Sequence, residues 1–196
     1  EEALADVDLE EAGSDLARAA AVRPSGAMPF SGAQELRFRV SGVAPGTLLP
    51  EDEQQRSLGE GRYAVVSPHE PGGVEEARDA GEMAPHLAAD ALIQSDHAVI
   101  REWSQRIVEG AEDPWARAQA IHRWVHENIG KRPVLSVPSA LDVLETREGD
   151  CNEHTVLFTA LARAAGVPTR IAIGIVWSDG LRGFYYHAWP EVFVGS

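Results

Sequence analysis

The stretch GDCNEHTVLFTALARAAGVP, residues 149–168, decides the fold. Asp150 is a favoured N-cap residue, and Gly166 stands where a helix commonly ends in the left-handed conformation. Between them most residues are apolar, above all in its second half, which is typical of a helix that is buried on most of its surface. The stretch therefore predicts a central helix that begins at Cys151.

Cys151 is the one cysteine of the chain, and its predicted place in the first turn of a helix favours chemistry. The first N–H groups of a helix lack partners within the helix and carry about half a positive charge. They favour the thiolate, which is the nucleophilic form of cysteine, and they can stabilise an oxyanion. A lone cysteine is also a common small core residue, so position alone leaves both roles open.

A second informative stretch lies close to the end of the sequence, where residues 184–194 are expected to form a strand. Alternate residues of a strand share a face, which places His187 with Tyr185 and Trp189. A thiol nucleophile needs an imidazole that takes its proton and returns it. His187 supplies this group if the strand packs against the cysteine helix, and otherwise it is a solvated or aromatic-packed strand histidine.

Together the two stretches resemble a known family. The first motif reads Gly149-Asp150-Cys151-x-Glu153-His154, Leu157-Phe158 and Ala160-Leu161-x-Arg163-Ala164-x-Gly166-Val167-Pro168-x-Arg170, and the second reads His187-Ala188-Trp189-x-Glu191-Val192. In order, spacing and side-chain type they resemble the core of the bacterial transglutaminase-like superfamily. Weaker similarity reaches back to residue 90.

The resemblance implies an α+β fold with a papain-like core, in which the cysteine helix packs on an antiparallel sheet that carries the histidine. It also implies a Cys-His-Asp centre, with Cys151 as the nucleophile and His187 as the base. In this family the aspartate follows on the next strand, where it fixes the imidazole tautomer. The sequence ends at Ser196, so we expect the core to be truncated before the aspartate.

Two neighbouring residues are expected to bind substrate or to support the centre. Trp189 is expected to pack beside His187. His154 follows Cys151 by three residues, which places the two side chains close together on a helix surface. The calcium-dependent animal enzymes of the family carry a tryptophan directly after the cysteine, where this chain has Asn152. The resemblance is therefore to the bacterial branch, and we expect no cofactor.

His122 and His126 have the i, i+4 spacing of metal ligands on a helix. No glutamate occupies the second position of an H-E-x-x-H motif between them. We interpret both as surface histidines and expect no metal site, and a metal-dependent hydrolase built on them is a minor alternative.

The sequence before the core divides into two parts. Residues 1–33 are first acidic and then broken by proline and glycine, and they are expected to form a poorly ordered leader. Residues 34–89 are expected to form a small β-rich segment and a linker, with strands near residues 36–40 and 62–67. The transglutaminase-like core is expected over residues 90–196.

Composition limits the partners. The chain has 196 residues, a net charge of −14 and a pI near 4.8, which argues against binding to nucleic acid. It contains no apolar run long enough to span a bilayer, so no membrane span is expected. The expected partner is a protein or peptide substrate. The oligomeric state is not indicated, and export from the cytoplasm is implied only by the family resemblance.

These features favour thiol-dependent acyl transfer or amide hydrolysis on protein or peptide substrates. Transamidation, deamidation and proteolysis all remain open at this point. Because no residue of the chain is assigned as the aspartate, a catalytically impaired interaction or structural module is the main alternative.

Overall fold

The computed structural model describes residues 21–26, 33–44, 49–52, 54–66, 80–132, 138–179 and 182–194. The chain forms two compact units, of which one comprises residues 24–74 and the other residues 1–23 and 75–196. Most of the expected leader lies outside the described residues. Within it, Val22, which belongs to the larger unit, forms an isolated antiparallel bridge with Phe184.

The smaller unit is a three-stranded antiparallel sheet in the order β1-β3-β2. Its strands are β1 (Glu35–Arg39), β2 (Gln55–Gly59) and β3 (Arg62–Val66). The rings of Phe38 and Tyr63 stack across β1 and β3, and Tyr63 is buried. Both strands were predicted, β1 from its alternating side chains, whereas β2 was missed because QRSLG holds a single large apolar residue.

The larger unit begins with short helical turns and continues with longer helices. The elements are α2 (Ala80–Met83), the 3₁₀ helix η1 (Ala84–His86), α3 (Ala98–Ile107), α4 (Pro114–Asn128), α5 (Ala140–Thr146) and α6 (Cys151–Ala164). Asp113 caps α4 by accepting the N–H of Ala116, and Ser139 caps α5 through a capping box with Asp142. Aspartate and serine are both favoured N-cap residues, which explains where these two helices begin.

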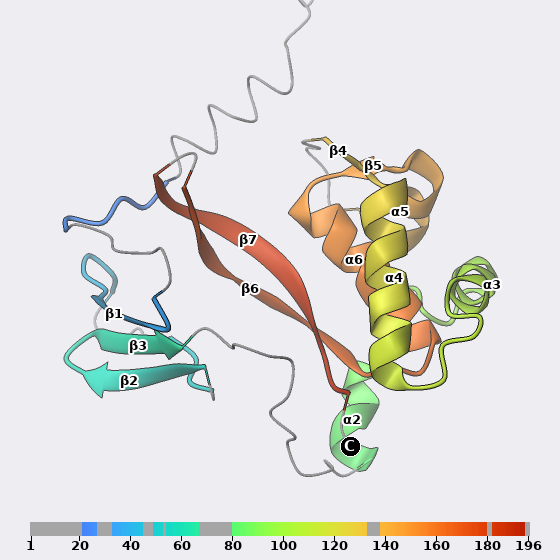
Figure 1. The fold of residues 1–196 in the computed structure, drawn as a ribbon, viewed down its shortest axis with the longest axis horizontal. Coiled ribbons are helices and arrows are strands. Elements are labelled where there is room, and N and C mark those ends of the chain that lie inside the picture. Colours follow the sequence, from blue (N-terminus) through green and yellow to red (C-terminus); the bar gives the residue numbers. More distant parts are fainter. Residues whose placement is uncertain are drawn as a thin grey trace, which may run out of the picture. The chain divides into compact units, whose positions relative to one another are not determined.

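Helix α6 is the centre of the hydrophobic core, and α3, α4 and α5 pack against it (Figure 1). Its side chains Leu157 and Leu161 are fully buried. The hydroxyl of Ser104 on α3 donates to the carbonyl of Leu161 at 2.8 Å, which satisfies a polar group inside the core. At the end of the helix Gly166 adopts a φ of +77°, the left-handed conformation predicted for this glycine.

Two long strands lie beside α6. Strands β6 (Thr169–Ser178) and β7 (Gly183–Val192) pair antiparallel in one uninterrupted register that includes Gly174 opposite His187. In Figure 1 one end of this strand pair lies next to the helices, and the other end extends away from them. The hydroxyl of Thr155 on α6 donates to the carbonyl of Ala188 on β7 at 3.0 Å and joins the two elements. The predicted α+β fold is therefore confirmed.

A short parallel pair completes the unit, formed by β4 (Gly130–Lys131) and β5 (Glu148–Gly149). It brings the end of α4 next to the start of α6. Among the described helices none is long and apolar enough to cross a membrane.

Candidate active site

The start of α6 is fixed by a capping box. The side chain of Asp150 accepts the N–H of Asn152 at 2.9 Å, and the carboxylate of Glu153 accepts the N–H of Asp150 at 2.8 Å. Glu153 lies so close to Gly149 that a Cβ on this glycine would stand 2.1 Å from the Glu153 Cβ. Only glycine fits there, and the arrangement holds Cys151 as the first residue of the helix.

The thiol of Cys151 is partly buried between α6 and β7. Burial raises the pKa of the Cys151 thiol, and the backbone N–H of Ala188 opposes this by hydrogen bonding to the sulfur. The carboxylates of Asp150 and Glu153 raise this pKa further, and the backbone N–H of Cys151 itself lowers it. We expected the helix start to favour the thiolate, but burial and the two carboxylates outweigh it. The thiol therefore needs a base to become a nucleophile.

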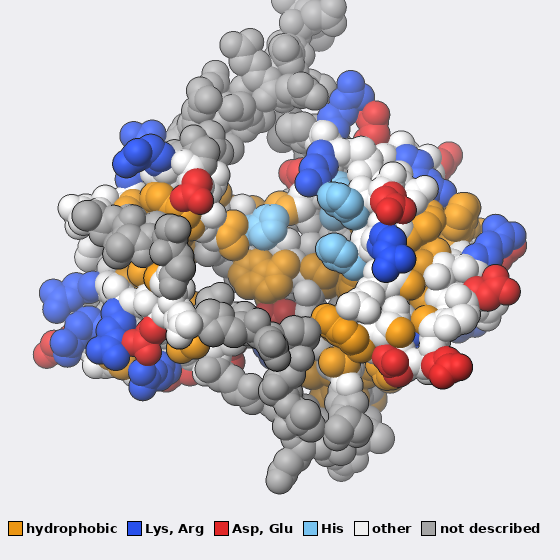
Figure 2. All heavy atoms as spheres, viewed as in Figure 1, with side chains coloured by type: hydrophobic (Ala, Val, Ile, Leu, Met, Phe, Trp, Pro, Cys, Tyr) orange, Lys and Arg blue, Asp and Glu red, His pale blue; other side chains and the backbone are white. Residues whose placement is uncertain are grey.

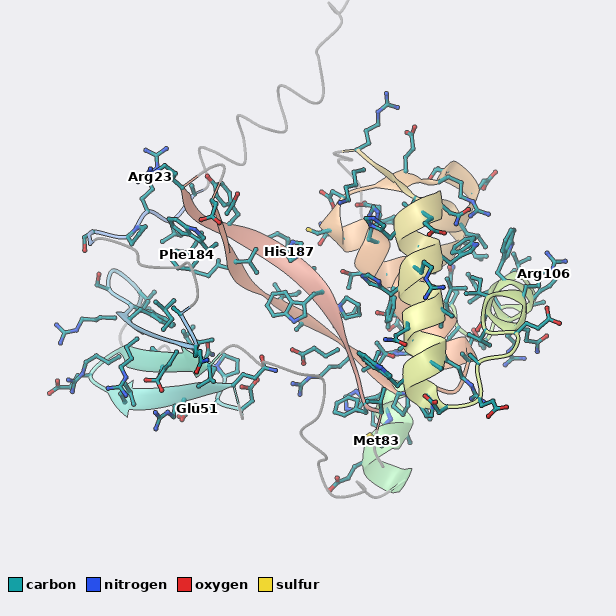
Figure 3. The ribbon with its side chains drawn as sticks, viewed as in Figure 1. Arg23, Glu51, Met83, Arg106, Phe184 and His187 are labelled. Carbon is teal, nitrogen blue, oxygen red and sulfur yellow. The ribbon has the colours of Figure 1, made fainter. Side chains whose placement is uncertain are left out.

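His187 lies on β7 and points towards the α6 side of the strand pair (Figure 3). Its imidazole stacks on the indole of Trp189, with ring centroids 6.1 Å apart and planes inclined by 22°. The indole N–H donates to the carboxylate of Glu191 at 3.2 Å, and the Arg170 guanidinium donates to the other oxygen of that carboxylate. Trp189 therefore packs beside His187, as predicted, and Glu191 and Arg170 hold the indole in place.

Cys151 and His187 line one cavity of about 590 Å³. The lining residues are His122, Val125, His126, Lys131, Arg132, Asp150, Cys151, His154, Thr155, Phe158, His187, Ala188, Trp189 and Pro190. Figure 2 shows imidazole and hydrophobic side chains gathered around a hollow of the surface. The fold therefore brings together all four residues that the sequence singles out for the site, which include His154 and Trp189.

His154 is tied to the start of α6. Its Nδ1 lies 2.6 Å from the carbonyl oxygen of Asp150. A carbonyl oxygen can only accept a hydrogen bond, so Nδ1 is the ring nitrogen that carries the proton and donates to it. In the described part of the chain Nε2 is buried and has no hydrogen-bond partner.

Several lining residues were missed by the sequence analysis. His122 and His126 are exposed, as predicted, but they also line the cavity, and their rings lie parallel with centroids 6.3 Å apart. Lys131 and Arg132 follow from β4. Their sequence positions carry no signal of a site, because the parallel pairing of β4 with β5 is what brings them to Cys151.

The described residues contain no group of three or more His, Cys, Asp or Glu side chains placed to hold a metal ion. His122 and His126 therefore find no third ligand among these residues, and the metal-dependent hydrolase has no structural support in the described part of the chain.

Comparison with known proteins agrees with the fold and the motifs. A model of the transglutaminase-like superfamily matches residues 101–196. A solved structure of a proposed cysteine protease from Cytophaga hutchinsonii has a TM-score of 0.54 at 19% identity, covering 82% of this chain and 68% of its own. The periplasmic domain of TgpA from Pseudomonas aeruginosa has a TM-score of 0.51 at 17% identity, covering 68% of this chain and 49% of its own.

A protein of unassigned function from Haemophilus influenzae is 32% identical over 95 residues. The match covers 46% of this chain and only 26% of that protein, so the chain spans about a quarter of the length of this curated relative. Residues 101–196 of the chain match the model of the transglutaminase-like superfamily, and the solved structures share its fold. The cysteine at the start of a buried helix and the imidazole on the adjacent strand lie within this matched region.

Proposed function

We propose that the chain catalyses thiol-dependent acyl transfer or amide hydrolysis on protein or peptide substrates. The observation that carries this proposal is the shared cavity of Cys151 and His187, where the N–H of Ala188 contacts the sulfur. A nucleophile and a base in one water-accessible cavity are the minimum that this chemistry requires.

In the proposed mechanism His187 takes the proton of the Cys151 thiol, and the sulfur attacks the carbonyl carbon of an amide. The C–S bond forms, and the backbone N–H of Cys151, which the capping box around Asp150 does not engage, donates to the oxyanion. His187 then gives its proton to the leaving amine, and the C–N bond breaks to leave a thioester on Cys151. Water or a second amine attacks the thioester and regenerates the thiol.

Two side chains support this centre in the proposal. Trp189 holds the imidazole plane of His187 by stacking, and Glu191 and Arg170 hold the indole. His154 fixes the start of α6 through the Asp150 carbonyl and presents its side chain to the cavity. Hydrolysis by water and transfer to an amine differ only in the group that resolves the thioester.

The second candidate function is a catalytically impaired interaction or structural module, and one observation favours it. Among the described residues no carboxylate hydrogen-bonds to His187, whereas the superfamily centre uses an aspartate for this role. In that case the cavity binds a peptide without turnover.

The deciding experiment incubates the protein with a glutamine-containing protein, with and without a labelled primary amine, next to a Cys151→Ala control. Incorporation of the amine supports transfer, release of ammonia alone supports deamidation, and new peptide ends support proteolysis. No product, together with no reaction of Cys151 with iodoacetamide at neutral pH, contradicts the enzymatic proposal and supports the module.

We also propose a location outside the cytoplasm. The fold likeness to the periplasmic domain of TgpA supports it. Fractionation of cells that express the full-length protein, probed with an antibody to this domain, tests the location, and recovery only with cytoplasmic markers contradicts it.

A further inference from the structure

One wall of the cavity consists of side chains that donate hydrogen bonds and can carry positive charge. His122 and His126 stand one turn apart on α4, and Lys131 and Arg132 follow on and after β4. In Figure 2 imidazoles lie on both sides of the hollow, with Lys or Arg side chains at its rim. The proposed mechanism assigns no role to this wall.

Backbone pairing fixes Lys131 next to the nucleophile. Lys131 of β4 is the register partner of Gly149 in β5, and the N–H of Arg132 donates to the carbonyl of Gly149 at 3.0 Å. Paired strands lie about 4.8 Å apart, and Gly149 precedes Cys151 by two residues. The backbone of Lys131 is therefore within side-chain length of the Cys151 end of the cavity.

Of the two permanently charged side chains in this wall, Arg132 is paired with a carboxylate and Lys131 has no such partner among the described residues. The Arg132 guanidinium contacts both oxygens of Glu148, at 3.0 and 3.2 Å. For Lys131 no hydrogen-bond or ion-pair partner occurs among the described residues. Of the described lining residues only Asp150 is acidic, and its carboxylate is engaged by the N–H of Asn152. The ammonium of Lys131 thus faces the cavity region without a counter-charge from the described residues.

The positive charge of this cavity wall is opposite in sign to the net charge of the whole chain. The chain has a net charge of −14 and one lysine, and that lysine lines the cavity. Ammonium and imidazole N–H groups bind carboxylates through charge-assisted hydrogen bonds. A cavity of about 590 Å³ is within the usual size range of ligand sites.

We infer that the cavity takes an acidic peptide segment, in which an Asp or Glu side chain binds at Lys131, His122 and His126 while a neighbouring amide lies at Cys151. This inference rests on the proposed function and names its substrate class. A nucleic acid has the same sign of charge, but the net charge of the chain repels a long polyanion, whereas a short peptide reaches the local cationic wall.

The test measures binding separately from turnover. Three fluorescein-labelled hexapeptides carry one central glutamine and differ only in the two flanking residues, which are glutamate, serine or lysine. Fluorescence anisotropy gives their Kd values for the Cys151→Ala chain, alone and combined with Lys131→Met. The matched control is Arg101→Gln, which also removes one exposed positive charge but lies on α3 outside the cavity lining.

The glutamate peptide is expected to bind about tenfold more tightly than the serine peptide at low salt, and the lysine peptide most weakly. Lys131→Met is expected to reduce the tenfold preference to about twofold, Arg101→Gln to leave it unchanged, and added salt to weaken it. Equal Kd values, no binding of any peptide, or equal effects of the two substitutions would overturn the inference.

The same peptides, tested for turnover by the unsubstituted chain, separate this inference from the proposed function. Turnover of all three peptides with equal kcat/KM contradicts the preference for acidic peptides but supports the proposed enzymatic function. Tight and selective binding of the glutamate peptide without turnover contradicts the proposed enzymatic function and supports the acidic-peptide site.

Discussion

The indole of Trp189 lies directly over Gly174 on the neighbouring strand, so that a Cβ at this glycine would stand 2.9 Å from the indole Cη2. Gly174 is also the register partner of His187, whose imidazole stacks on the same indole. The glycine therefore provides the space in which Trp189 lies flat, and through Trp189 it sets the plane of the His187 ring.

Gly174→Ala is expected to impair His187 more than it impairs folding. The new methyl group meets the far end of the indole, which can turn away at a cost of about 1 kcal/mol or less, but the stack on His187 is then lost. We expect kcat to fall about tenfold while the free energy of unfolding changes little. Steady-state kinetics and denaturant unfolding check this.

Ile173→Ala is the matched control for Gly174→Ala, because Ile173 is the preceding residue of β6 and is 67% exposed. Unchanged kinetics in Gly174→Ala, or an equal loss in both variants, would show that the indole does not position His187.

Asp150→Asn is expected to make Cys151 more reactive at neutral pH. The Asp150 carboxylate raises the pKa of the Cys151 thiol, and asparagine removes the charge while it keeps the N-cap hydrogen bond. A lower pKa means more thiolate at pH 7, so alkylation by iodoacetamide becomes faster and its pH–rate curve shifts to lower pH.

Because the chain has one cysteine, intact-mass measurement of this alkylation reports on Cys151 alone. Asp113→Asn, which changes the N-cap of α4 in the same way, serves as the control and leaves the curve in place. A curve for Asp150→Asn that coincides with the control, or shifts to higher pH, would refute the electrostatic role of Asp150.

Glu153 is expected to make stability decline as pH rises. Burial raises the pKa of the Glu153 carboxyl above 4.5, and the neighbouring Asp150 side chain raises it further. The folded state then holds a proton that the unfolded state has lost, so the free energy of unfolding falls as pH increases from about 4.5 through the folded pKa. Glu153→Gln removes this part of the dependence and keeps an acceptor for the Asp150 N–H.

Glu153→Ala removes that acceptor as well and is expected to cost about 1–2 kcal/mol at every pH. Urea unfolding from pH 4 to pH 8 measures both variants. If the free energy of unfolding of Glu153→Gln depends on pH as steeply as that of the unsubstituted chain, the Glu153 carboxyl is not the source of this pH dependence.

Thr155→Val is expected to loosen the contact between α6 and β7. The threonine hydroxyl donates to the Ala188 carbonyl in the buried interface, and valine keeps the shape but leaves that carbonyl unpaired. The expected loss of stability is about 1–3 kcal/mol, with a fall in activity because Ala188 and His187 are adjacent.

Thr159→Val is the control for Thr155→Val, since its hydroxyl bonds only within α6, to the Thr155 carbonyl. Its expected effect on activity is small. An equal loss of activity in both variants would assign the effect to helix stability rather than to the α6–β7 contact.

Helix α6 could be predicted from the sequence because its signals are local. Asp150 marks its start through a side chain that accepts the N–H of Asn152, and Gly166 marks its end through its own φ. Cys151 and His187 were likewise found from the helix start, the strand alternation and the family resemblance.

The cationic wall could not be predicted, because it depends on contacts between distant parts of the chain. Nothing around Lys131 indicates that its strand pairs with Gly149, and His122 and His126 offer only the spacing of metal ligands. The raised pKa of Cys151 was missed for the same reason, since burial against β7 is a tertiary effect that a helix-start argument does not contain.

The central claim is that Cys151 becomes acylated with His187 as its base, and intact-mass measurement of a trapped thioester tests it most directly. The chain is mixed with a glutamine peptide and quenched in acid at short times. The account predicts an acyl adduct on Cys151 that is absent in Cys151→Ala and forms at least about 100-fold more slowly in His187→Asn. An adduct that forms equally fast in His187→Asn, or no adduct in the unsubstituted chain, would contradict it.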